Sequence, residues 1–269
     1  MQEPLPIGLT FDLDAETLWL ARDPSLAHDA VWVSQGRYGP KVGLPRILSL
    51  LAEYDILATF FIPGLVIERY PGSVRAILEN GHEVAHHSYS HRWIGTLSPA
   101  EERDEMERGI AAIQAATGRQ PAGWRSPAAA FSEITLGLLE EYGFDYSSNM
   151  FDDDKPYLLT DGDRTTAIVE LPFAWVLDDA AFWLYSNRIP GRSLAAPSAV
   201  LESWTLELRG LQSEGGNTMV IAMHPQIIGR HSRLWVLRSF IEAALATAAV
   251  RFSRLDAIAE AARRSLLAT

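Results

Sequence analysis

Glycine recurs in this sequence at one kind of position, just after a helical pattern and just before a short apolar run. Gly81, Gly118, Gly143 and Gly216 all stand there. Glycine adopts the left-handed conformation that ends a helix at little cost, so these residues mark helix ends. A chain in which helices and strands alternate in this way builds a largely parallel sheet, open or closed into a barrel. The alternation therefore predicts an α/β fold.

The predicted elements follow this alternation along the whole chain. The expected strands are 7–12, 57–62, 83–85, 123–125, 144–147, 167–171, 218–223 and 250–253. The expected helices are 45–53, 74–79, 98–116, 132–142, 198–213, 233–248 and 256–264, and Ser98 with Glu101 predicts a capping box at the third of them. No linker or repeat divides the chain, so we expect one domain over residues 1–269, with an irregular insertion at about 151–197.

Polar side chains follow several of the predicted strands. Asp12 and Asp14 close the first strand, a histidine-rich segment follows the third, Arg125 ends the fourth, and His224 follows strand 218–223. In βα folds the active site lies at the carboxyl ends of the strands. We therefore expect these side chains to converge on one edge of the sheet.

Four of the seven histidines lie within ten residues, at His82, His86, His87 and His91. Imidazole is a common ligand of zinc and cobalt, and a spacing of four residues can present two rings to one ion. Both pairings, His82 with His86 and His87 with His91, have that spacing, which does not choose between them. The alternative is that these rings pack or cap in a loop. The chain has no cysteine, so any metal must bind nitrogen or oxygen ligands.

Asp12 and Asp14 share one face of the first strand. Two carboxylates facing one site repel, so we expect one to hold a cation or proton while the other acts as a base. Arg125 can keep an aspartate ionised, and His224 can act as a general acid. The structural alternatives are a solvated strand end, an ion pair and a histidine bonded to a backbone carbonyl. Taken with the histidines, the pattern favours a His/His/Asp site for metal-assisted hydrolysis.

These motifs, in this order, resemble those of the polysaccharide deacetylase (NodB-homology) family. The matching segments are 10–14 (TFDLD), 87–91 (HSYSH), 125–127 (RSP) and 224–225 (HP). The resemblance implies a distorted (β/α) barrel and chooses His87 and His91 as the histidine pair. The roles it implies are base for Asp12, metal ligands for Asp14, His87 and His91, general acid for His224, and tuning of the base for Arg125. The implied metal is zinc, with cobalt or another divalent ion as alternatives.

One departure from the common family pattern is Leu13, which separates the two aspartates. This spacing resembles an intracellular branch that includes a peptidoglycan deacetylase, cyclic imide hydrolases and allantoinases that lack the metal aspartate. Segments similar to that branch, and the tryptophans available to line a cleft, imply substrate contacts from Arg37, Tyr38, Asp153, Asp154 and Trp175. The branch also implies a homo-oligomer, often a tetramer.

The net charge and the hydropathy of the chain limit the classes of partner and the location that we expect for it. Lysine and arginine number 23 against 34 aspartates and glutamates, and a net charge of −11 argues against a nucleic-acid partner. No apolar stretch is long enough for a membrane helix, and no secretory signal is visible at the N-terminus, so we expect a cytoplasmic protein. We therefore favour a small cyclic imide or amide as substrate. The alternatives are an N-acetylated amino sugar, oligosaccharide or peptidoglycan, and a catalytically dead binding protein, which predicts a missing ligand or base.

Overall fold

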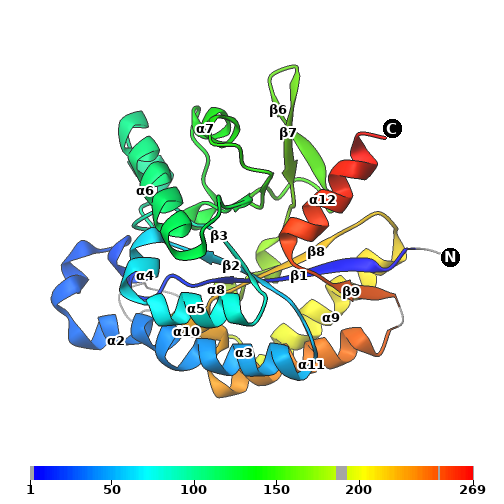
Figure 1. Ribbon diagram of the computed structural model, residues 1–269. Helices are drawn as coiled ribbons and strands as arrows, with labels where there is room; N and C mark the ends of the chain where they lie inside the picture. The colour runs from blue at the N-terminus through cyan, green and yellow to red at the C-terminus, as the bar shows by residue number, and fades with distance from the viewer. Residues whose placement is uncertain (1–2, 186–192, 248, 269) are drawn as a thin grey trace.

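Within residues 3–185, 193–247 and 249–268, which the computed structural model describes, nine strands form one curled sheet (Figure 1). The strand order is β6-β7-β5-β4-β3-β2-β1-β8, and β9 pairs with the start of β1. The strands are β1 (Leu5–Asp12), β2 (Thr59–Ile62), β3 (Glu83–His86), β4 (Gly123–Trp124), β5 (Tyr146–Ser147), β6 (Tyr157–Asp161), β7 (Arg164–Glu170), β8 (Met219–Met223) and β9 (Val250–Phe252).

The sheet is parallel except for the antiparallel β6–β7 hairpin. It curls into a half-barrel whose path ends at β6 and β8. Near those ends, the amide of Thr218 donates to the carbonyl oxygen of Asp154 at 3.0 Å. The expected barrel-like α/β fold is therefore confirmed. Because the strands are parallel, their carboxyl ends meet at one edge.

Helices cover both faces of the sheet. They are α1 (Thr17–Leu20), α2 (Ala30–Tyr38), α3 (Leu44–Glu53), α4 (Gly64–Arg69), α5 (Pro71–Glu79), α6 (Pro99–Thr117), α7 (Thr135–Glu141), α8 (Asp179–Trp183), α9 (Pro197–Ser213), α10 (Pro225–Ile228), α11 (His231–Leu245) and α12 (Leu255–Leu266). Short 3-10 helices are η1 (Pro24–His28), η3 (Ile94–Thr96), η4 (Pro127–Ala129) and η5 (Trp175–Leu177), and η2 (Gly39–Gly43) is a π-helix. No helix among the described residues is long and apolar enough to cross a membrane.

The structure confirms the glycines predicted at helix ends and the predicted capping box. The four glycines identified in the sequence all have positive φ, at 78°, 72°, 70° and 82° for Gly81, Gly118, Gly143 and Gly216. The capping box at the start of α6 is present, with Ser98 as its N-cap. The predicted helix 233–248 begins at His231 and ends at Leu245, and Ala248 lies outside the described residues.

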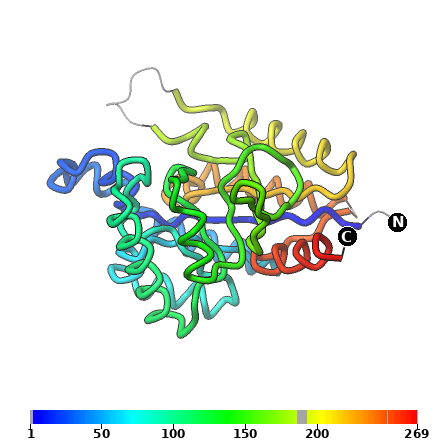
Figure 2. Tube along the Cα trace, turned by 90° about the horizontal axis from the view of Figure 1, so that it is seen from above, coloured from blue at the N-terminus to red at the C-terminus, as the bar shows by residue number. Residues whose placement is uncertain are grey.

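The core has two main layers, one on each face of the sheet. Apolar side chains of β1 and β8 pack on one face against α3, α9 and α11. On the other face, Leu255 and Ile258 of α12 pack against Phe61, Tyr146 and Val220 inside the curl of the sheet. Figure 2 shows β1 (blue) running between α9 (yellow) on one side and α12 (red) on the other. This packing fixes the strands and hence the positions of the residues at their ends.

Two stretches hold structure that the sequence pattern did not predict. Residues 13–44 contain α1, α2 and the π-helix, and Gly36 lets α2 pack directly on the backbone of Ala15 and Glu16. The segment 151–197 contains the unpredicted β6, η5 and α8. The strand expected at 167–171 is present there as β7, and it continues the main sheet by pairing with β5. Residues 186–192 of that segment lie outside the described residues.

Candidate active site

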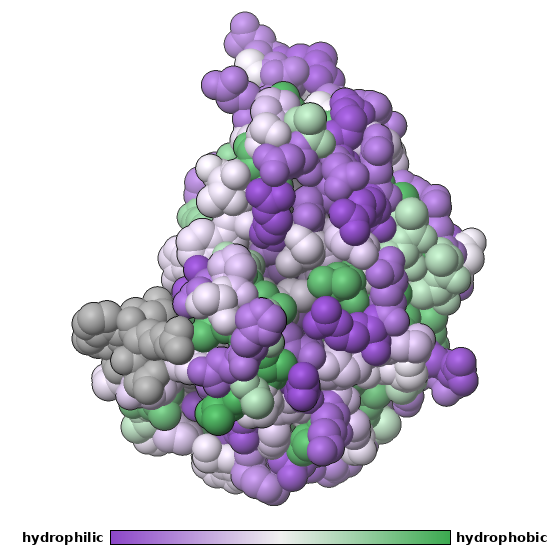
Figure 3. Space-filling view, turned by 90° about the vertical axis from the view of Figure 1, so that its left-hand side faces the viewer, coloured by the Kyte–Doolittle hydropathy of each residue, from purple (hydrophilic) through white to green (hydrophobic). Residues whose placement is uncertain are grey.

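Side chains from four strands meet at the carboxyl edge of the sheet. Asp12 ends β1, His87 follows β3, Arg125 follows β4, and His224 follows β8. They line a small cavity of about 60 Å³. Figure 3 shows the side of the molecule toward which β1 runs, and its surface is hollowed near the centre. The full lining is Asp12, Leu18, His87, His91, Arg125, Ser126, Ala128, Ala129, Phe173, Trp175, Asp178, Ala180, Ala222 and His224.

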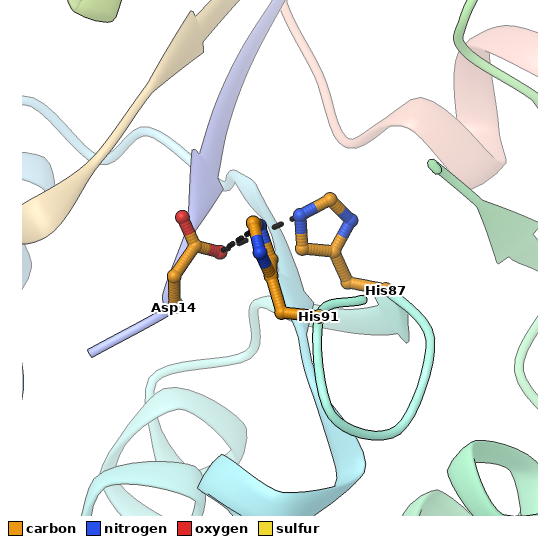
Figure 4. A group of neighbouring side chains, drawn as sticks. All are labelled: Asp14, His87 and His91. Atoms are coloured by element: carbon orange, nitrogen blue, oxygen red, sulfur yellow. Dashed lines mark ion pairs between the residues drawn. The ribbon is translucent and has the colours of Figure 1, made fainter. Parts of the chain in front are cut away.

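Asp14, His87 and His91 form a buried group at the floor of this region. Oδ1 of Asp14 lies 3.4 Å from Nε2 of His87 and 3.6 Å from Nε2 of His91. Figure 4 shows the carboxylate facing both rings. Nδ1 of His87 lies 2.7 Å from the carbonyl oxygen of Arg125, which can only accept, so Nδ1 donates and Nε2 keeps its lone pair. The three residues therefore present nitrogen and oxygen ligands to one point.

The polar atoms of this group fit a divalent cation. Neither carboxylate oxygen of Asp14 has a hydrogen-bond partner, although the side chain is fully buried. Burial, with the charges of Asp12 and the other nearby aspartates, raises the pKa of Asp14 well above its ordinary value. Burial also lowers the pKa of His91 well below its ordinary value, which keeps that ring neutral. Unpartnered carboxylate oxygens beside neutral imidazoles are the ligands that zinc binds in catalytic sites.

The other two clustered histidines are engaged elsewhere. Nδ1 of His82 accepts a hydrogen bond from the amide of Ala58 at 3.1 Å. Nε2 of His86 donates to the carbonyl oxygen of Met106 at 3.1 Å, and burial lowers the pKa of His86 to about 3. The structure thus brings together His87 and His91, and it places His82 and His86 in structural roles.

Asp12 is held as a carboxylate by Arg125. Nη1 of Arg125 donates to Oδ1 of Asp12 at 2.9 Å and to the hydroxyl of Thr10 at 2.8 Å. Ser148 fixes the other side of the guanidinium through its carbonyl and its hydroxyl, at 3.2 and 2.9 Å. Burial would raise the pKa of Asp12, but the charge of Arg125, aided by nearby histidines, holds it below its ordinary value. An ionised carboxylate in this position can accept a proton.

His224 has a carboxylate partner that sequence reasoning missed. Nδ1 of His224 donates to Oδ1 of Asp179 at 2.7 Å, and the His224 amide donates to Oδ2 at 3.0 Å. Burial would lower the pKa of His224, but the charge and hydrogen bond of Asp179 raise it well above its ordinary value. This shift favours the protonated ring, whose Nε2 lies 3.7 Å from Oδ2 of Asp14. A protonated imidazole here can donate a proton.

Asp178 also lines the cavity, although no sequence pattern singled it out. It pairs with Ala222 in an isolated parallel bridge beside β8, and its carboxylate caps α8 by accepting from the amide of Ala180 at 2.7 Å. Burial, partly offset by His224, raises the pKa of Asp178 to about 6. The only available signal was the pair Asp178–Asp179 before a short helix, and capping explains such a pair equally well.

The residues expected to contact substrate divide into two groups. Trp175 lines the cavity, is half-exposed, and stacks on Phe151 with ring centroids 4.8 Å apart. The other four lie outside the cavity lining. Arg37 pairs with Glu16 at 3.5 Å, and the Tyr38 hydroxyl donates to the carbonyl of Gly229 at 3.3 Å. Asp153 accepts a hydrogen bond from the backbone amide of Lys155 in its own loop, and Asp154 is exposed.

Comparison with known proteins identifies the class to which this fold and site belong. The family model described as polysaccharide deacetylase matches residues 37–147. A crystal structure from Mycobacterium smegmatis, assigned to the polysaccharide deacetylases, is 36% identical, covers 98% of this chain and 92% of its own, and superposes with a TM-score of 0.92. The chain therefore belongs to the polysaccharide deacetylase family and is a hydrolase of amide carbon–nitrogen bonds, as the motifs predicted.

Two further proteins are similar to this chain, one in sequence and one in fold. The peptidoglycan deacetylase of Helicobacter pylori is 27% identical over 97% of this chain and 97% of its own length. The crystal structure of PuuE allantoinase is 24% identical, covers 95% of this chain and 89% of that one, and superposes with a TM-score of 0.80, which shows a shared fold. The distorted (β/α) barrel expected from the sequence is thus confirmed.

Proposed function

We propose that this protein is a metal-dependent hydrolase of a non-peptide amide bond in a small molecule, with a cyclic imide or ureide as the preferred substrate. The observation that carries the proposal is that two pairs of side chains lie beside Asp14, one with a lowered pKa and one with a raised pKa. Asp12 with Arg125 forms a proton acceptor, and His224 with Asp179 forms a proton donor. Amide hydrolysis needs both, because water must lose a proton and the leaving nitrogen must gain one.

Asp14, His87 and His91 would hold the metal ion. We propose zinc, because two imidazoles and one carboxylate without thiolates form a typical catalytic zinc ligand set, and cobalt is the alternative. When bound, the ion would polarise the scissile carbonyl and acidify water. Asp12 takes the proton from the attacking water while Arg125 keeps Asp12 ionised and oriented. His224, oriented by Asp179, protonates the departing nitrogen.

The size and walls of the cavity support a compact substrate. Its volume of about 60 Å³ is room for only a few atoms, since one buried water needs about 10–15 Å³ measured in this way. Leu18, Phe173 and Trp175 give it apolar walls. A five-membered imide ring or an acetamido group fits this description, and the flat imide ring makes more packing contact with the aromatic walls.

A second candidate is the removal of an N-acetyl group from an amino sugar, oligosaccharide or peptidoglycan. It is favoured by the match to the Helicobacter pylori peptidoglycan deacetylase, which extends over nearly the full length of both chains. Trp175, which lines the cavity and stacks on Phe151, would then bind the sugar. A panel of succinimide, hydantoin and acetylated chito-oligomers, assayed with the zinc-loaded protein, separates the two candidates. Turnover confined to the chito-oligomers would overturn the cyclic imide proposal.

We further infer that residues 1–269 act as one domain, because a single sheet carries site residues from both halves of the chain. Trp235 on α11 and Leu206 on α9 are both 56% exposed, and the two helices pack against each other. These side chains support assembly into a homo-oligomer, and we propose a tetramer. We also propose a cytoplasmic location, which matches a chain without cysteine. Light scattering of the purified chain tests the oligomer.

A further inference from the structure

The loop that carries His87 and His91 has an unusual backbone. Ser88 and His91 have positive φ values of 63° and 66°, although neither is glycine. Residues other than glycine rarely adopt this backbone conformation, and it persists only where the surrounding structure enforces it. The loop residues between the two histidines are Ser88, Tyr89 and Ser90. Their contacts therefore determine whether the two rings stay aimed at one point.

Glu105 of α6 supplies these contacts. Its Oε2 accepts hydrogen bonds from the Ser88 hydroxyl at 2.6 Å, the Tyr89 amide at 3.0 Å and the Ser90 amide at 2.7 Å. Its Oε1 accepts from the Ser90 hydroxyl at 2.6 Å. The side chain is buried, at 6% exposed. One carboxylate thus binds four donors, which come from every residue between the two histidines.

The rest of α6 approaches the same loop closely. A Cβ at Gly109 would lie 2.3 Å from Nε2 of His86 and 2.8 Å from the carbonyl oxygen of Ser88, so only glycine allows this approach. His86 joins the helix to the loop, because Nε2 donates to the carbonyl of Met106 while Nδ1 accepts from the Ser88 amide at 3.2 Å. Over these residues α6 packs closely against the loop, and Glu105 makes its charged contact.

We propose that Glu105 is a positioning residue that sets the metal affinity of the site by holding His87 and His91 in their ligating arrangement. Charge-assisted hydrogen bonds are roughly twice as strong as neutral ones, so the carboxylate is suited to enforce this backbone. Glu105 has no role as acid or base in the proposed reaction. The inference rests on the proposed metal site, and the experiment below separates failure of the one from failure of the other.

The test compares zinc affinity, measured by competition with a chelating dye, in wild type and three variants. Glu105→Ala removes all four bonds, Glu105→Gln keeps the shape without the charge, and Ser90→Ala removes one bond and leaves the charge. We expect Glu105→Ala to lower the affinity by about 10- to 100-fold, with smaller losses for the other two. The visible spectrum of the cobalt-loaded protein should change in the same order, because it reports ligand geometry.

Glu102 offers a matched control on the same helix. It is also buried and also accepts hydrogen bonds from hydroxyls, but within the described part of the chain its carboxylate bonds to Ser132 and Thr135 and not to the histidine loop. Glu102→Gln should leave zinc affinity and the cobalt spectrum unchanged. Wild-type affinity in folded Glu105→Gln and Ser90→Ala, or an equal loss in Glu102→Gln, would overturn the inference. Absence of zinc binding by the wild type would overturn the metal site itself, and this inference with it.

Discussion

Two aspartates separated by one residue meet opposite electrostatic environments. Asp12 receives a guanidinium hydrogen bond that holds its pKa below the ordinary value, whereas burial among other acids raises the pKa of Asp14 well above it. The two aspartates are therefore suited to different roles at the site. Asp12 is a base that needs no further cation, and Asp14 is a carboxylate that requires one.

Asp12→Asn removes the proposed base and keeps its shape. We expect kcat to fall by a factor of about 100 to 10,000, the usual worth of general acid–base catalysis, while zinc content stays at the wild-type level. Initial rates and elemental analysis of the same preparations check both parts. Asp163→Asn, at an exposed turn, should behave as wild type. Near-normal turnover of Asp12→Asn would remove this residue from the mechanism.

Asp179 should control the alkaline side of the pH profile. Its charge raises the pKa of His224, so the acid stays protonated to higher pH. Asp179→Asn removes that charge, lowers the pKa of His224, and should move the alkaline limb of the kcat/KM profile to lower pH. The acid limb, which follows Asp12, should move much less. An unchanged alkaline limb would show that His224 is not the acid.

Sequence reasoning at this scale reached the residues of the strand ends and the pairing of Arg125 with an aspartate, but it missed Asp179, the partner of His224. Asp12, Arg125 and His224 follow apolar strands, and the parallel fold brings such positions together. Asp179 bonds to His224 beside a bridge that joins residue 178, in an irregular segment, to Ala222 of β8. No local pattern encodes that contact. Arg37 and Tyr38 show the reverse, since they matched a motif yet lie outside the cavity lining.

At the scale of elements, local signals predicted helix ends well. Ser98 caps α6, and its backbone amide donates to Glu101 at 2.8 Å, as the sequence pattern indicated. The bounds of α1, α2 and α8 were not predicted, because these short helices depend on tertiary contacts such as the packing of Gly36 on Ala15.

Ser98→Ala tests the capping box. Loss of the cap should lower the free energy of unfolding by about 1 kcal/mol, measured by urea denaturation. Ser203→Ala provides the comparison, because the Ser203 hydroxyl bonds to the carbonyl of Ala199 within α9 and alanine suits a helix interior. Equal stability of Ser98→Ala and wild type would show that the cap contributes nothing.

At the scale of the whole molecule, a buried acid joins α12 to the inside of the half-barrel. Glu83 of β3 accepts from the hydroxyls of Thr59 and Tyr146, at 2.6 and 2.9 Å, and from the amide of Asp256 at 3.2 Å. Burial, together with the charge of Asp256, raises the pKa of Glu83 to about 7. The sequence placed Glu83 on a strand but gave no sign of this role.

This acid predicts a pH dependence of stability. Between its ordinary pKa of 4.5 and the folded value of about 7, the folded chain holds a proton that the unfolded chain has lost. Stability therefore falls as the pH rises through that window. Glu83→Gln cannot titrate, so its unfolding free energy should fall less steeply than that of wild type between these pH values. Identical slopes in urea titrations of the two proteins would contradict the assignment.

The central claim is that Asp14, His87 and His91 form a metal site on which amide hydrolysis depends. The most direct measurement is a titration of metal-stripped protein with zinc, in which succinimide or hydantoin hydrolysis is followed as a function of zinc per chain. We predict no turnover without zinc and a linear rise that ends at one equivalent per chain. Turnover by the metal-stripped protein, undiminished by a strong chelator, would contradict the claim.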